Sequence, residues 1–111
     1  MKRGNAFRKG DIIIVDFPYS DFSGAKRRPA LVIGASEEHI IVAFITTKKT
    51  GPSRWFISIA ATSQTGMVAP SYIRCDKILA VDVTVTEGGI GVAENQILEK
   101  VDAKLRRLLS L

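Results

Sequence analysis

The stretch GDIIIVDFPYSDFSGAKRRPALVI, residues 10–33, joins two short apolar runs through a polar segment that ends in three adjacent cations. The runs DIIIVDF (11–17) and PALVIG (29–34) are rich in β-branched residues, which favour strands. The segment between them contains Pro, Ser and Gly, as turns and loops require. The stretch therefore predicts two strands joined by a loop over 18–28.

The rest of the chain repeats this pattern and then changes its period. Further short apolar runs are HIIVAFITT (39–47), WFISI (55–59), SYIRC (71–75) and ILAVD (78–82). From Glu94 onward, apolar residues instead follow one face of a helix: Ile97, Leu98, Val101, Leu105, Leu108 and Leu109. We expect a mainly β fold, a small barrel that is closed or nearly closed so that few strand edges are exposed, with one amphipathic C-terminal helix.

Length and charge limit the class of protein. The 111 residues, 46% of them hydrophobic, are enough for one core, so we expect a single domain over 1–111. Lys and Arg number 16 against 11 Asp and Glu, and the net charge of +5 favours a polyanion or an acidic protein as partner. No apolar run is long enough for a membrane span and the first residues lack a signal peptide's apolar region, so we expect a cytoplasmic protein.

Single cysteine and histidine residues exclude several kinds of site. Cys75 is the only cysteine, so one chain has no internal disulfide and no zinc site built from cysteines. We interpret Cys75 as a small packed residue, because free cysteine is usually buried. His39 is the only histidine, which excludes a two-histidine acid/base pair within the chain. An enzyme built on this chain must use carboxylates, hydroxyls and cations.

The three cations of the expected loop have two interpretations. In the first interpretation, Lys26, Arg27 and Arg28 protect an aggregation-prone strand from association with other chains. In the second they bind RNA, because Tyr19 and Phe22 in the same loop offer rings for bases while the cations bind phosphates.

Three segments in this order, GDIIIVDFPYSDFSGAKRRPALVI (10–33), AFITT (43–47) and YIRCDKILAVD (72–82), resemble the MazF/PemK (Kid) family of toxin endoribonucleases from type II toxin–antitoxin pairs. The resemblance implies an SH3-like barrel, shared with the CcdB toxins, with a C-terminal helix. It also implies a metal-independent, sequence-specific endoribonuclease without cofactors, which cleaves single-stranded RNA to 2',3'-cyclic phosphate and 5'-hydroxyl ends and so inhibits translation and growth. The implied partners are RNA, a second copy of the chain and an acidic antitoxin.

Family motifs assign candidate catalytic residues by position. They are Arg28 before the loop proline, Thr46 at the end of a strand, and Arg74 with Asp76 in the R-C-D segment. Thr47 is a second candidate for the threonine. The sequence departs from the family at Ser23, where many members have a glutamate, and Asp21 is shifted by two residues, so an acidic role there stays open.

The residue types suit RNA cleavage by attack of the 2'-hydroxyl. A guanidinium with paired donors stabilises charge on the non-bridging phosphate oxygens, and we assign this role to Arg28 and Arg74. Arginine is a poor base because its pKa exceeds about 12, so Asp76 is the expected proton carrier. Each residue also has a purely structural interpretation: Thr46 as a strand former, and Arg74 with Asp76 as a surface ion pair.

A second set of residues is expected to contact the RNA backbone: Lys26, Arg27, Thr47, Lys48, Lys49 and Arg54. The neighbouring Trp55 is either a core residue or a stacking platform. Two other functions remain open from sequence. One is a gyrase poison of the CcdB type, against which the C-terminal sequence RRLLSL speaks because that class carries aromatic residues there. The other is an RNA-binding barrel without catalysis, since residues alone do not fix geometry.

Overall fold

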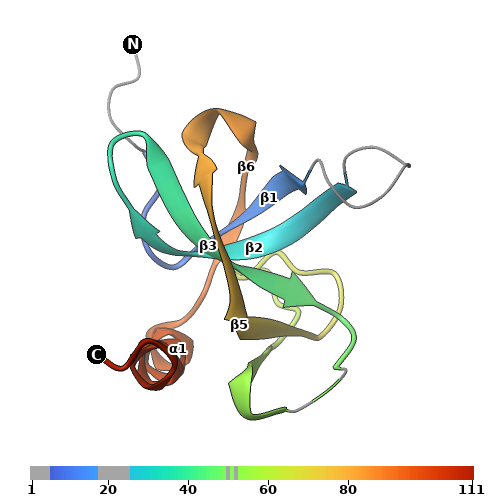
Figure 1. Ribbon diagram of the computed structural model, residues 1–111. Helices are drawn as coiled ribbons and strands as arrows, with labels where there is room; N and C mark the ends of the chain where they lie inside the picture. Colours follow the sequence, from blue (N-terminus) through green and yellow to red (C-terminus); the bar gives the residue numbers. More distant parts are fainter. Residues whose placement is uncertain (1–5, 18–25, 50, 52) are drawn as a thin grey trace.

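Six strands make one curled antiparallel sheet in the computed structural model, which describes residues 6–17, 26–49, 51 and 53–111 (Figure 1). In order across the sheet the strands are β4 (Phe56–Ile59), β5 (Ser71–Asp82), β3 (His39–Thr46), β2 (Lys26–Ala35), β1 (Asp11–Phe17) and β6 (Thr86–Val92). A short 3-10 turn at Ser53–Trp55 precedes β4, and another at Val83–Val85 precedes β6. The helix α1 (Asn95–Leu109) follows β6. The expected mainly β fold with a C-terminal helix is confirmed.

The sheet differs from the expectation at the three cations. Strand β2 begins at Lys26, and Arg27 and Arg28 pair with Asp16 and Val15 of β1. The prediction that these cations lie in a loop over 18–28 is therefore wrong. They extend strand β2 on the N-terminal side of Pro29. The hydrogen-bonded backbone of the strand fixes the side of the sheet toward which each side chain points.

Two further differences concern β5 and β6. The segments 71–75 and 78–82 form one strand, because β5 is interrupted only by a bulge opposite the step from Ala43 to Phe44 of β3. Strand β6 has the sequence TEGGIGV and was not expected, since glycine weakens a strand. A Cβ on Gly91 would lie 2.2 Å from the carbonyl oxygen of Thr65, so the turn at 60–67 approaches too closely for any other residue.

The alternation of side chains gives the sheet two apolar faces. One cluster, which includes Ile12, Leu31, Ile45 and Ile73, packs against Val101 of α1. The other cluster consists of Ile13, Val15, Ala30, Val32, Ile40 and Val42, with Phe44 packed against it. Neighbouring residues of one strand thus belong to opposite faces, as the period of two requires.

Helix α1 lies along one side of the sheet, near the C-terminus of the chain (Figure 1). Its buried residue Val101 and the half-buried Leu98 and Leu105 face the first cluster. Arg106 and Arg107 lie in its last turn, where cations favour the helix dipole, and Ser110 ends it in the left-handed conformation. In the described ranges, neither α1 nor any other helix has the length and apolar character needed to cross a membrane.

Candidate functional site

Arg28 and Thr46 lie at the same end of two adjacent strands. Strand β2 pairs with β3 through Ala30 and Phe44, and the antiparallel direction places Arg28 and Thr46 each two residues further toward this end. Because both are two residues from a paired position, both are on the face of Ala30 and Phe44. Arg28 is exposed and Thr46 is half-buried. The Thr46 Oγ1 accepts a hydrogen bond of 3.1 Å from the Lys48 backbone N–H.

Arg74 is on the same face, in the neighbouring strand β5. It pairs with Phe44 of β3 on one side and with Phe56 of β4 on the other. The Arg74 Nε donates to Asp76 Oδ1 at 3.1 Å, and its Nη2 donates to Oδ2 at 2.9 Å. Tyr72 occupies the next position on this face, between Thr46 and Ser58. The sheet thus brings all four candidate catalytic residues to one face.

Basic side chains lie against aromatic rings across this part of the sheet. The distances to the ring centroids are 4.9 Å from Arg74 Cζ to Phe56, 5.4 Å from Lys49 Nζ to Tyr72, and 5.8 Å from Arg54 Cζ to Trp55. The Phe56 and Tyr72 rings meet edge to face at 6.1 Å. We call these six residues the cation–aromatic face. Cations beside rings are the combination that binds the phosphates and bases of single-stranded RNA.

The expected RNA-contact residues separate into those on this face and those away from it. Lys49 and Arg54 belong to the cation–aromatic face, and Thr47 and Lys48 are exposed directly after Thr46. Arg27 lies on the opposite side of β2 from Arg28, and its Nε is 3.4 Å from Asp16 Oδ1.

Some expectations fall where the structure gives no description. The side chain of Lys26 lies outside the described residues, and so do Asp21 and Ser23, whose acidic role was left open. Trp55 is half-buried beneath Arg54, so it has both a packed side and an accessible side.

Sequence reasoning missed Phe56 and Tyr72 as members of the site. A signal was present, because SYIRC and WFISI alternate between residues for the core and residues for the other face. The pairing of β4 with β5 was needed to place both rings beside Arg74.

Cys75 lies behind the site, on the other face of β5. It is fully buried in the cluster against α1, and this burial raises the pKa of its thiol to about 11. The interpretation of Cys75 as a packed residue is confirmed. Within the described segments, no three His, Cys, Asp or Glu side chains gather in a way that could hold a metal ion.

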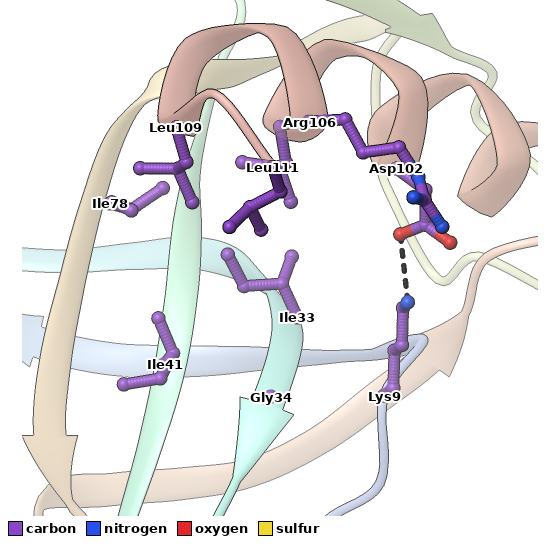
Figure 2. Close-up of a pocket in the computed structure, with 10 residues that line it drawn as sticks. Lys9, Ile33, Gly34, Ile41, Ile78, Asp102, Arg106, Leu109 and Leu111 are labelled. Atoms are coloured by element: carbon purple, nitrogen blue, oxygen red, sulfur yellow. Dashed lines mark ion pairs between the residues drawn. The ribbon is translucent and has the colours of Figure 1, made fainter.

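A groove lies between α1 and the sheet (Figure 2). This groove has a volume of about 350 Å³ and is lined mainly by aliphatic residues: Ile33, Ile41, Ile78, Leu105, Leu109 and Leu111. Its charged rim contains an ion pair of 2.7 Å between Lys9 Nζ and Asp102 Oδ1. We call it the helix groove. Its other charged lining residue is Arg106, at the last turn of α1.

Comparison with known protein families identifies one that matches nearly the whole chain. Residues 8–109 match the family described as PemK-like, MazF-like toxin of type II toxin-antitoxin system. A comparison with curated proteins finds no match.

Several solved structures have a similar fold. An endoribonuclease in complex with its cognate antitoxin from Mycobacterial species has a TM-score of 0.75 and 14% identity, over 96% of this chain and 97% of that chain. Mycobacterium tuberculosis toxin MazF-mt6 has a TM-score of 0.71 and 21% identity, over 91% of this chain and 97% of that chain. MazE-MazF from Deinococcus radiodurans (Form-III) has a TM-score of 0.72 and 20% identity, over 93% of this chain and 95% of that chain.

At these identities the structural likenesses establish the fold, and they confirm the barrel architecture with a C-terminal helix that the resemblance implied. The family match spans nearly all of the described residues, including every candidate catalytic residue. The chain therefore belongs to the PemK-like, MazF-like toxins of type II toxin–antitoxin systems.

Proposed function

We propose that this toxin is a metal-independent, sequence-specific endoribonuclease that cleaves single-stranded RNA and thereby inhibits translation and growth. The observation that carries the proposal is the common face of Arg28, Thr46, Arg74 and Asp76 within a chain of this toxin family. The similar solved structures include proteins named as endoribonucleases, which supports the same activity. The products are a 2',3'-cyclic phosphate and a 5'-hydroxyl.

In this proposal the two arginines stabilise the charge that develops on the phosphate. Arg28 is exposed at the end of β2, and Arg74 has donors left beyond those that Asp76 accepts. A fixed guanidinium is suited to the non-bridging oxygens of the pentacoordinate transition state. Thr46 holds the scissile phosphate. Asp76 moves a proton, because each of its oxygens accepts one hydrogen bond from Arg74 and keeps a second lone pair for the substrate.

The proposal includes two protein partners. A homodimer is supported by the family to which the chain belongs, and an acidic antitoxin is supported by two similar structures that contain an antitoxin or MazE. The net charge of +5 favours an acidic segment that competes with RNA for the same cations.

The test is incubation of the purified, folded toxin with a long single-stranded RNA in excess EDTA, with the fragment ends mapped. We expect defined cuts with cyclic-phosphate ends from the wild type and their loss in Arg28→Ala. Arg107→Ala is the control, because Arg107 lies in the last turn of α1. Intact RNA across several substrates would refute the nuclease and leave an RNA-binding barrel or a gyrase poison, and gyrase inhibition by the same sample separates those two.

A further inference from the structure

The guanidinium of Arg74 is held on two of its sides. Along one edge, Nε and Nη2 donate to the two oxygens of Asp76 at 3.1 and 2.9 Å. In addition, the guanidinium lies over the ring of Phe56, with 4.9 Å between Cζ and the ring centroid. The Arg74 side chain is only 27% exposed, so these contacts restrict most of its surroundings.

The donors of Arg74 divide unequally between Asp76 and the substrate. A guanidinium has five N–H donors, of which Asp76 takes two, and the three that remain are on Nη1 and Nη2. These donors point away from the carboxylate and match the paired oxygens of a phosphate. Their direction is fixed only if the plane of the guanidinium cannot rotate, and Asp76, which contacts only the Nε/Nη2 edge, covers neither face of that plane.

Phe56 is itself rigidly placed. It is 8% exposed, begins β4, and pairs across the sheet with Arg74. The Tyr72 ring meets it edge to face, with 62° between the ring planes. The phenylalanine on the other side of Arg74, Phe44, lies beneath a different cation, with Lys77 Nζ 4.9 Å from its centroid.

We infer that Phe56 is a positioning residue for RNA cleavage, which acts by fixing the plane of the Arg74 guanidinium so that its free donors meet the phosphate. The inference rests on the proposed nuclease function. A prepositioned donor stabilises the transition state without reorganising during the reaction. Loss of the ring therefore lowers kcat while KM, which depends on the charge that remains, changes little.

The kinetic test is a double-mutant cycle with RNA as substrate. We expect Phe56→Leu to lower kcat about tenfold, which corresponds to ~1.4 kcal/mol in activation free energy. Phe56→Tyr keeps an aromatic ring and should have a kcat close to the wild-type value. In an Arg74→Ala background, Phe56→Leu should have no further effect, because the residue acts through Arg74. Phe44→Leu is the matched control, and its kcat should stay close to the wild-type value. A loss of kcat from Phe56→Leu that persists in the Arg74→Ala background overturns the inference.

A second measurement is independent of activity. In ¹⁵N NMR spectra of the folded proteins, we expect the Arg74 Nε–Hε signal to be resolved in the wild type and in Phe56→Tyr, and to shift and broaden in Phe56→Leu. Thermal unfolding confirms that each variant is folded. If the wild type leaves RNA intact, the nuclease proposal fails while this signal still decides whether Phe56 holds Arg74. A signal unchanged in folded Phe56→Leu refutes the positioning role.

Discussion

The two faces of strand β5 differ in what their side chains do. Tyr72, Arg74 and Asp76 face outward, where they contact rings, cations and each other. Ile73 and Cys75, which alternate with them, are fully buried against the cluster that α1 covers. Further along the same strand, beyond the bulge, Ile78 lines the aliphatic helix groove (Figure 2).

Because side chains alternate between the two sides of a strand, adjacent residues of β5 contribute either to stability or to chemistry. Charged groups are costly to bury, so the cations stay where water and rings surround them, and burial of apolar area stabilises the other face. Substitutions at adjacent positions of β5 should therefore change different properties of the toxin.

The largest effect is expected on the buried side of β5. Ile73→Ala removes a fully buried side chain from the cluster against α1 and should lower the free energy of unfolding by roughly 2–5 kcal/mol. Urea unfolding followed by circular dichroism measures the change, and Ile73→Val should cost only about 0.5–1.5 kcal/mol. A change in Ile73→Ala as small as that of Ile73→Val would mean that the buried face carries little of the stability.

One residue further along, Arg74→Ala should have the opposite profile. Loss of a preorganised donor lowers kcat/KM for RNA cleavage by about 10²–10³. Stability should fall less than in Ile73→Ala, because Arg74 lies outside the buried cluster against α1 and its ion pair with Asp76 is partly open to water. The matched control is Arg106→Ala, an arginine at the helix groove. Equal losses of activity in both variants would show that net charge matters and the cation–aromatic face does not.

Predictions from the sequence succeeded where a local pattern decides the structure. The β-branched runs at 11–17 and 39–47 and the helical period after Glu94 mark elements whose apolar side is buried by the chain as a whole. The strand at 86–92 could not be found this way, because its glycines weaken the strand pattern and Gly91 is explained only by the approach of the turn at 60–67.

The candidate site was predictable only in part, because some of its residues are brought together by strands that are distant in the sequence. Arg28, Thr46, Arg74 and Asp76 came from family motifs, which carry sequence order. The rings came from pairing in space: Phe56 and Tyr72 join the site because β4 lies beside β5, a neighbour that no local pattern specifies. The directions of Arg27 and Arg28 likewise depend on β2 extending back to Lys26.

A smaller effect is expected from the cations that contact rings at the edge of the face. Lys49→Ala should weaken RNA binding severalfold and reduce the slope of log affinity against log salt by about 0.7, the value for one phosphate contact on a single strand. A 2'-O-methyl RNA is the probe, because it lacks the nucleophile and is not cleaved. Lys100→Ala, on the exposed side of α1, is the control. An unchanged slope in Lys49→Ala would place this cation outside the RNA path.

The smallest effect is expected from a thiol reagent at Cys75. Burial disfavours the thiolate and raises the pKa of Cys75 from 9.0 to about 11, so almost no thiolate exists at pH 8. The native toxin should therefore react with DTNB far more slowly than the urea-unfolded chain, in which the single cysteine is labelled at once. A Cys75→Ser variant carrying Ala103→Cys supplies an exposed thiol on α1 for comparison. Labelling of native Cys75 as fast as that control would mean that the α1 side of β5 opens readily, and the division between a chemical face and a stabilising face would then fail on the side where burial defines it.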